Sequence, residues 1–510
     1  MTKEINKGYT PGKVKQGKNN SVVLARFFMD EYADLAFDAN RELFIYDPIE
    51  GIYNNVDDKK FDSLFMAFLT KNNVTDIWKL NRINEVKRAI HALDRVLVVE
   101  FDAYDNLICF KNCIINLDEM KKFDFSPEYY FTSRVNIDYD NKATSAPVFT
   151  KFLETTFTDN KHEPDSETIN NILRIGGYLF YPQNRLELMF LFLGEGANGK
   201  SILITLFEMF FDQKNVSYLD LDTLSSKSLE RESLIGSRLN TTTEAKSSKM
   251  DSEMIKKVIS SEGLEVTRKN RKSIKYIPTT KLVVASNTQP YFNDTSHGIY
   301  RRLFPITFRN RFVSPQEYEV THMAEANRIF VGDDKKEIIN GFKLEISGIL
   351  NLFIGGLNDL RNKKWQLKMS ENSETTLSEY KNSGDSVTQF LTEFFEEDTD
   401  KDWIGVAVHD IYHDYREWYH ANVAETALKY GIQALGKKIK DMWRIEPFRK
   451  ETTNGKRATF YPLKRKLYAN RNEIQTTTAS RINGDQSEAI ATFEAEVSQG
   501  KLDIPKQQAN

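Results

Sequence analysis

Hydrophobic positions in the middle of the chain follow two different patterns. Short runs that are apolar throughout, such as residues 188–193 and 282–285, alternate with segments whose apolar residues recur at helical spacing. Continuous apolar runs of this length are typical of parallel strands that are buried on both faces of a sheet. The pattern therefore predicts an α/β core with a doubly wound parallel sheet, which we assign to residues 188–370.

The pattern changes upstream of this core. Residues 21–140 combine short apolar stretches with turn signals, which predicts a small α/β or β-rich domain. Residues 141–187 return to helical spacing and predict a helical segment that leads into the first core strand. The polar, basic residues 1–20 are expected to form a flexible tail.

Downstream of the core, residues 371–385 are polar and predict a linker. Residues 386–466 contain helical patterns followed by a basic hairpin with its turn at Asn454-Gly455, which together suggest a winged-helix domain that binds DNA. A packing domain with a solvated hairpin is the alternative. The tail at 467–510 is polar and poor in aromatic residues, so we expect it to be largely disordered.

Composition narrows the class of protein. The chain of 510 residues is 40% hydrophobic and 28% charged, which is a globular profile with room for several cores. Cys109 and Cys113 lack a second ligand pair and are expected to be core thiols. No charged-then-apolar leader opens the sequence and the apolar runs are too short to span a bilayer, so we expect a cytoplasmic protein without a membrane segment. A net charge of −3 means that binding to nucleic acid must come from local basic patches.

The strongest chemical signal follows residues 188–193. The next eight residues fit the pattern G-x-x-x-x-G-K-[ST] and precede a helical pattern: Gly194, Glu195, Gly196, Ala197, Asn198, Gly199, Lys200 and Ser201. Glycines let backbone N–H groups surround a phosphate, and the following helix adds the positive end of its dipole. Lys200 is expected to reach the β and γ phosphates and Ser201 to hold Mg²⁺, so the segment predicts a site for ATP. A purely structural glycine-rich turn is the alternative.

Two later strand ends carry further candidates. Glu244 ends a polar strand, where its carboxylate could polarise water or support the metal, although Thr243 stands where an Asp is usual. Asn287 ends a second apolar strand, in the segment 279–290, and could orient a water beside the γ phosphate. Each residue also has an alternative interpretation: Glu244 as a solvated surface carboxylate and Asn287 as a turn residue.

Basic residues gather in three places. Arg301 and Arg302 could neutralise charge on a transferring phosphoryl group, within the subunit or from a neighbour. A predicted hairpin between Glu244 and Asn287 carries five cations able to contact DNA phosphates: Arg268, Lys269, Arg271, Lys272 and Lys275. The hairpin in the winged-helix region carries four: Arg449, Lys450, Lys456 and Arg457. Solvated surface charge is the alternative for each group.

Taken in order, these motifs resemble the core of superfamily 3 helicases of the phage, plasmid and poxvirus-type primase–helicase group, over about residues 147–360. The resemblance implies an AAA+-like core in a hexameric ring that hydrolyses ATP at subunit boundaries and pulls single-stranded DNA through its pore. It implies that Gly194–Ser201 is the Walker A loop, Glu244 the Walker B acid and Asn287 the first sensor. Arg301 or Arg302 is then the arginine finger, and the hairpin around Lys269–Lys272 touches DNA.

The resemblance leads us to expect a replicative helicase or initiator of a phage or mobile element. Its expected partners are single-stranded and origin DNA, further copies of itself, and polymerase, primase or single-strand-binding proteins. Residues 1–140 contain no acid cluster or zinc cysteine set for primer synthesis. Two other classes stay open, namely a P-loop metabolic kinase and a DNA-binding regulator that uses ATP only to assemble.

Overall fold

The computed structural model describes residues 20–93, 95–226, 229–242, 252–269, 271–287, 290, 292, 297–320, 328–383, 386–399, 405–422, 431–451 and 457–466. The chain divides between Leu377 and Ser378 into two compact units, which are described separately. The predicted tails fall mainly outside the described residues. Asn20 is the first described residue, and its side chain accepts hydrogen bonds from the backbone N–H groups of Val22 and Val23 in helix α2.

The first unit opens with a small α/β layer. Its elements in chain order are α2 (Ser21–Glu31), β1 (Leu35–Phe37), β2 (Leu43–Asp47), β3 (Ile52–Asn55), α3 (Asp58–Lys71), η1 (Thr75–Ile77), α4 (Leu80–Ala92) and β4 (Leu97–Val98). The four strands form one sheet in the order β3-β2-β1-β4. Stacked phenylalanines from α2 and α3 fill the core between the helices and the sheet. This layer agrees with the α/β pattern of the sequence.

A second, three-stranded sheet follows, in the order β5 (Leu107–Cys109), β6 (Ile114–Asn116) and β7 (Lys121–Phe123), and η2 (Pro127–Tyr129) comes after it. Its alternate residues Ile108 and Ile115 pack into the same apolar cluster as the central core. The predicted boundary at residue 140 therefore does not coincide with a break between cores. Cys109 and Cys113 are buried and form no disulfide, as expected.

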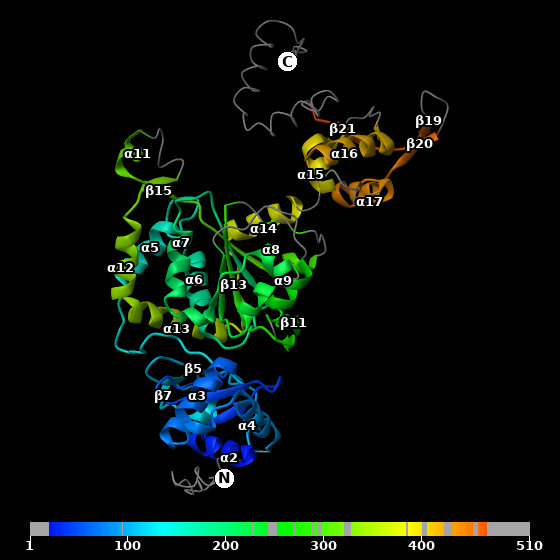
Figure 1. The fold of residues 1–510 in the computed structure, drawn as a ribbon. Helices are drawn as coiled ribbons and strands as arrows, with labels where there is room; N and C mark the ends of the chain where they lie inside the picture. Colours follow the sequence, from blue (N-terminus) through cyan, green and yellow to red (C-terminus); the bar gives the residue numbers. More distant parts are fainter. Residues whose placement is uncertain are drawn as a thin grey trace. The chain divides into compact units, whose positions relative to one another are not determined.

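The central sheet has five parallel strands in the order β14-β8-β13-β10-β9. Their bounds are β8 (Met189–Leu193), β9 (Val216–Ser217), β10 (Leu239–Thr242), β13 (Lys281–Ser286) and β14 (Leu303–Thr307). Every residue of β8, β10 and β13 is buried, and helices lie on both sides of the sheet (Figure 1). This arrangement is the parallel α/β core that the alternating runs predict.

Several shorter elements connect or flank these strands. They are α5 (Pro147–Thr156), α6 (Ser166–Phe180), α7 (Lys200–Glu208), η3 (Gln213–Asn215), α8 (Leu221–Ser225), η4 (Leu229–Leu234), α9 (Ser252–Ile259), β11 (Leu264–Val266), β12 (Ile274–Tyr276) and α10 (His297–Tyr300). The helical lead-in expected at residues 141–187 is α5 with α6. Strands β11 and β12 pair antiparallel and form the predicted basic hairpin.

A further subdomain follows the central sheet. It consists of β15 (Arg311–Val313), α11 (Pro315–Val320), β16 (Ile329–Val331) and α12 (Lys335–Leu344), with β15 and β16 paired in parallel. Helix α12 packs against α5 and α7. We refer to residues 311–344 as the lid.

Helix α13 (Ile346–Asn362) packs along α6, with glycines from both helices at the contact. A Cβ atom at Gly177 of α6 would lie 2.0 Å from the Phe353 carbonyl oxygen, and one at Gly356 of α13 would lie 2.3 Å from the Leu173 carbonyl oxygen. Only glycine permits this approach of the two backbones. No single helix in the described ranges meets the length and hydropathy of a membrane span, although α12 and α13 meet them as a pair bent by 78°.

Helix α14 (Glu371–Ser383) occupies the stretch that we expected to be a linker, and the boundary between the two units falls inside it. Its polar sequence has low apolar content but no proline or glycine, so nothing in it interrupts a helix. The stretch expected to be a linker is therefore helical, and the boundary between the two compact units falls within it.

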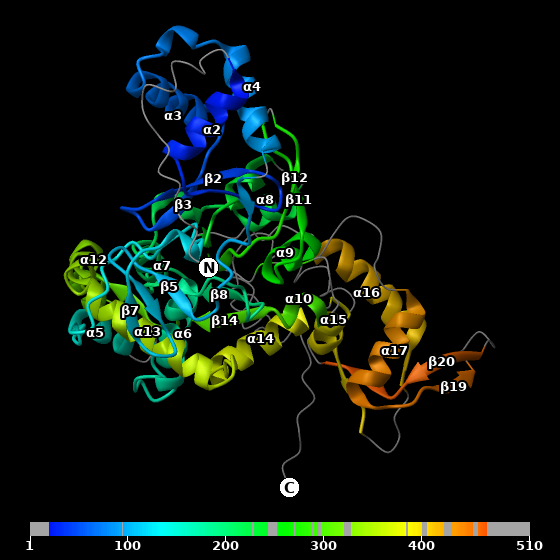
Figure 2. The same ribbon diagram turned by 90° about the horizontal axis from the view of Figure 1, so that it is seen from below.

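The second unit consists of helices and short strands around one apolar core (Figure 2). Its elements are α15 (Ser386–Phe394), β17 (Phe395–Glu397), β18 (Val406–Ala407), α16 (Val408–Asn422), α17 (Ile432–Trp443), β19 (Phe448–Glu451), β20 (Arg457–Tyr461) and β21 (Leu463–Arg465). Strands β19 and β20 pair antiparallel from Phe448 with Phe460 to Glu451 with Arg457, so the predicted hairpin is present. Its turn at Asn454-Gly455 lies outside the described residues.

Candidate functional site

The glycine-rich loop connects the carboxyl end of β8 to the first turn of α7. Gly196 and Gly199 have φ values of 110° and 90°, which side chains rarely tolerate, and Gly199 is the N-cap of α7. A Cβ atom at Gly194 would lie 2.5 Å from the Phe308 carbonyl oxygen, so this position needs glycine because of close packing. The glycines of the motif thus create a turn that opens onto the positive end of a helix.

Lys200 is buried at the base of this loop. Its Nζ donates hydrogen bonds to the Gly194 carbonyl oxygen, to Asn198 Oδ1 at 3.0 Å and to Asn287 Oδ1 at 3.2 Å. None of these partners is a carboxylate, and burial lowers the pKa of Lys200 to about 8. An anion bound in the loop would restore the favourable environment that the ammonium group lacks.

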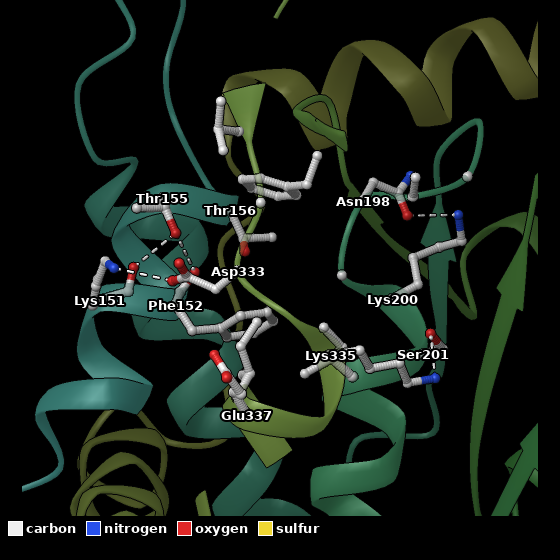
Figure 3. A pocket seen from close by; sticks show the side chains of 18 of the residues that line it. Lys151, Phe152, Thr155, Thr156, Asn198, Lys200, Ser201, Asp333, Lys335 and Glu337 are labelled. Carbon is white, nitrogen blue, oxygen red and sulfur yellow. Dashed lines mark hydrogen bonds and ion pairs between the residues drawn. The ribbon is translucent and has the colours of Figure 1, made fainter. Parts of the chain in front are cut away.

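A cavity of about 650 Å³ opens beside the loop (Figure 3). Gly196–Ser201 line one side of it, whereas Gly194 and the exposed Glu195 are not among the lining residues. The opposite walls come from α5 and the lid, with apolar side chains that include Val148, Phe152 and Phe312. The volume lies within the usual range for small-molecule sites, and the walls combine a polar phosphate-binding side with an apolar side.

The lid is attached to the loop through the backbone. The Phe312 N–H of β15 donates a hydrogen bond of 2.7 Å to the Ala197 carbonyl oxygen. Ala197 itself has a φ of 48°, a conformation that non-glycine residues seldom adopt. The lid therefore helps to hold the loop in its turn, which is a role that the sequence analysis did not assign to these residues.

Asn287 lies beside the loop, because β13 is the neighbour of β8 in the sheet and both strands end at the same edge. Its side-chain oxygen accepts the hydrogen bond from Lys200. The next strand, β10, ends at Thr242, so the chain continues from this edge toward Glu244. Thr243 and Glu244 themselves lie outside the described residues, and the role predicted for Glu244 stays a prediction.

Strand β10 is polar but entirely buried, and its side chains explain why. Asn240 accepts a hydrogen bond from the Leu219 N–H and donates one to the Leu219 carbonyl oxygen, both at 2.9 Å. Thr242 Oγ1 donates to the same carbonyl oxygen at 2.8 Å. These side chains continue the strand pairing where the two-residue strand β9 ends. The unusual polarity noted in the sequence thus has a structural cause in these two residues.

Arg301 and Arg302 lie at the opposite edge of the sheet from the loop. Arg302 directly precedes β14, and its carbonyl oxygen accepts a hydrogen bond from the first residue of β8. Since β8 has five residues, the two edges are separated by about 16 Å. That distance is longer than an arginine side chain, so neither guanidinium reaches the loop of its own chain.

The two arginines also differ from each other. Arg302 is mostly buried and donates to Ser260 Oγ at 2.8 Å and to the Gly298 carbonyl oxygen at 2.9 Å. Arg301 is exposed, and within the described part of the chain it has no hydrogen bond or ion pair. Arg302 therefore links the start of β14 to the C-terminal end of α9 and to α10. The guanidinium of Arg301 is accessible to another molecule.

Two arginines of the β11–β12 hairpin contact the N-terminal layer. Arg268 is 10% exposed and forms an ion pair of 3.1 Å with Glu42, and Arg271 lies 3.7 Å from Asp57. The side chain of Asn40 donates to the Lys275 carbonyl oxygen at 3.2 Å. Lys269 and Lys272 are exposed. Of the cations predicted to bind DNA, the two arginines thus have acidic partners, with Arg271 still exposed, and the three lysines including Lys275 are exposed.

Among the basic residues predicted in the second unit, Arg449, Lys450 and Arg457 are exposed on the β19–β20 hairpin. Lys456 lies outside the described residues. In the part of the chain that the structure describes, no cluster of three or more His, Cys, Asp or Glu side chains is placed to hold a metal. Ser201, the predicted metal ligand, has an exposed side chain at the start of α7.

Two protein families match separate segments of the chain. Residues 25–158 match the family described as D5 N terminal like. Residues 192–302 match a family of unknown function, DUF5906. The first segment extends from the N-terminal layer to the end of α5, and the second from the end of β8 to Arg302. The lid and the second unit lie outside both matches.

Whole-protein comparisons give distant relatives. The chain is 23% identical over 250 residues to the putative primase C962R of African swine fever virus, in two isolates, and the aligned part is 46% of this chain. The chain spans about a quarter of the length of these relatives. Apo structures of the NrS-1 C terminal region are 13% identical, with TM-scores of 0.45 and 0.44, and cover 84% and 87% of this chain and 96% and 99% of their own.

The sequence analysis gave no role to the lid residues that line the cavity, among them Phe312, Asp333 and Lys335. They stand more than a hundred residues after the loop in the chain and follow no phosphate-binding pattern. Only the fold brings residues this far apart together: β15 places Phe312 beside Ala197, and the packing of α12 against α7 places Lys335.

Proposed function

We propose that this chain is an ATP-dependent DNA helicase of the superfamily 3 type, acting in the replication of a phage or other mobile element in the host cytoplasm. The sheet order, with the loop strand β8 between β14 and β13, supports an AAA+-like core. The D5-like segment and the distant viral relative support a role in replication. In the second unit, three helices and a basic hairpin support a winged-helix domain for origin DNA.

One observation carries the proposal. The loop opens into its cavity at one edge of the sheet, while Arg301, which is exposed and has no ion pair among the described residues, lies at the other edge. An enzyme that acted alone would need its charge-neutralising arginine in its own site. A motor whose subunits complete one another needs the arrangement seen here, because Arg301 would enter the cavity of the adjacent copy. We therefore assign the finger to Arg301 and a positioning role to Arg302.

In this proposal the residues of the chain share the work as follows. The loop N–H groups and Lys200 bind the phosphates, Asn287 orients the water, and Glu244 polarises it. Ser201, whose hydroxyl is exposed at the cavity, would hold Mg²⁺ together with Glu244. The metal would neutralise phosphate charge. The exposed Lys269 and Lys272 would contact single-stranded DNA, and each cycle would move the hairpin.

The test is strand displacement on a forked DNA, with ATP and with a non-hydrolysable analogue. Unwinding with ATP alone is expected. ATP turnover that DNA does not stimulate would favour a metabolic kinase, which has no use for single strands. Binding of ATP and DNA without turnover would favour the regulator that uses ATP only for assembly.

A mixing experiment tests the shared site. Arg301→Ala is expected to reduce hydrolysis about 10³ to 10⁵-fold and to leave ATP binding unchanged. Adding Lys200→Ala subunits should restore part of the turnover, because an Arg301→Ala subunit then receives an intact finger from its neighbour. Absence of rescue in mixtures that verifiably co-assemble would contradict a site shared between subunits.

A further inference from the structure

The lid crosses the cavity beside the loop and touches both of its flanking helices. Asp333 forms an ion pair of 3.0 Å with Lys151 of α5. Two residues later, Lys335 Nζ donates a hydrogen bond of 3.3 Å to Ser201 Oγ at the start of α7. Figure 3 shows both contacts, with Lys335 directed toward Ser201. The segment from Val331 to Lys335 thus connects α5 to the phosphate-binding helix.

Helix α12 fixes the point from which Lys335 extends. The Asp334 side chain caps the helix by accepting hydrogen bonds from the backbone N–H groups of Lys336 and Glu337. At the other end, the buried Phe342 packs edge-on against Phe149 and Phe152 of α5, with ring centroids 5.6 Å and 5.4 Å apart. The backbone of Lys335 is therefore held in place, and only its flexible side chain can change direction.

The charges around the cavity single out Lys335. Three lysines line the cavity, and Lys151 among them is neutralised by Asp333. Lys200 and Lys335 have no carboxylate partner in the described ranges of the chain. Glu337 also lines the cavity and opposes an anionic ligand. Among the described lining residues, two ammonium groups without a carboxylate partner therefore face one remaining carboxylate. This balance fits a polyanion better than a neutral metabolite.

We propose that Lys335 is a second nucleotide-binding lysine, which acts on the triphosphate bound by the loop of its own chain. This inference rests on the proposed function. In the structure the Lys335 ammonium group uses the Ser201 hydroxyl as an acceptor. When a nucleoside triphosphate is bound, the ammonium group turns to a phosphate oxygen, a stronger acceptor than a hydroxyl because it is charged. The Ser201 oxygen is then released for a cation.

The experiment measures ATP binding to the full chain by calorimetry, without DNA. Lys335→Ala is expected to weaken binding about tenfold, the usual loss for one hydrogen bond to a charged group. Lys335→Arg keeps the charge and should stay close to wild type. Lys336→Ala is the matched control, because Lys336 is the next residue of the same helix, is exposed and does not line the cavity. Thermal melting of each variant checks that the fold is retained.

Three results are decisive in different ways. Equal ATP affinity of Lys335→Ala and wild type, with affinity lost in Lys200→Ala, would overturn this inference and leave the proposed function intact. A wild-type chain that binds no ATP would overturn the proposed function and this inference with it. An equal loss in Lys335→Ala and Lys336→Ala would also overturn it, because the effect would then come from net charge and not from the cavity.

Discussion

The nucleotide cavity and the β11–β12 hairpin are both rich in positive charge, but they hold that charge differently. In the cavity, Lys200 is buried with neutral partners only, and burial lowers its pKa. On the hairpin, Arg268 is as well covered but already has a carboxylate partner, Glu42. Among the described residues, the first cation has no counter-charge and the second has one. Charge in a sequence therefore indicates a potential site, and pairing decides whether that charge is available.

Separate replacement of Lys200 and Arg268 is expected to give the largest difference between the two regions. Lys200→Ala is expected to reduce ATP turnover about 10² to 10³-fold, the usual cost of losing one group that stabilises the reacting charge. Arg268→Ala should leave turnover without DNA near the wild-type level, since its charge is used by Glu42. Steady-state phosphate release measures both. A comparable loss in Arg268→Ala would show that the two regions are not independent.

The pH dependence of ATP binding tests whether the pKa of Lys200 in the cavity is lowered. Lys200 has a pKa of about 8, and a bound triphosphate raises it, so binding takes up a proton when the pH is above 8. ATP affinity is therefore expected to fall about tenfold between pH 7 and pH 9. Calorimetry at several pH values measures this, and proton uptake follows from buffers with different ionisation enthalpies. A flat profile would contradict the lowered pKa.

Removal of the counter-charge tests the hairpin. Glu42→Gln releases Arg268, so affinity for single-stranded DNA is expected to rise several-fold at low salt, with a salt slope steeper by about 0.7. Glu265→Gln is the matched control, because it removes the same charge from an exposed position on β11 itself. Fluorescence anisotropy with a labelled oligonucleotide measures both. Equal gains in the two variants would mean that net charge, and not the ion pair, limits binding.

The smallest effect is expected for the exposed cations. Lys269→Ala and Lys272→Ala should each reduce the salt slope for single-stranded DNA by about 0.7, because each removes one phosphate contact. Arg268→Ala should change the slope less, since Glu42 already compensates that charge. The same anisotropy assay at several salt concentrations compares the three variants. A larger change in salt slope for Arg268→Ala than for the two lysine variants would contradict the conclusion that Glu42 compensates the charge of Arg268.

The sequence predicted those features of the fold and the site that depend on residues close together in the chain. The loop at 194–201 needs glycine conformations, a preceding strand and a following helix, and all of these signals lie within about thirty residues. The parallel sheet followed from its buried apolar runs in the same way. These features could be derived without knowledge of the fold.

The remaining features depend on contacts between distant parts of the chain. The pair of Arg268 with Glu42 joins residues separated by 226 positions, and Lys335 reaches Ser201 across 134. Nothing in the sequence near Arg301 or Arg302 indicated that one would be fastened by Ser260 and the other left exposed. Availability of a side chain is a property of the packed structure, so residue type and spacing could not decide it.

The positions of the loop and of Arg301 at opposite edges of one sheet restrict the symmetry of any assembly that uses both. A two-fold axis would let two copies exchange arginines only if the loop and Arg301 lay on one self-complementary patch. If each copy places its Arg301 in the cavity of the next copy, the interface must be head-to-tail and join unlike surfaces. Repetition of such an interface either closes on itself or continues as a filament, and the angle between the two surfaces of one subunit decides which.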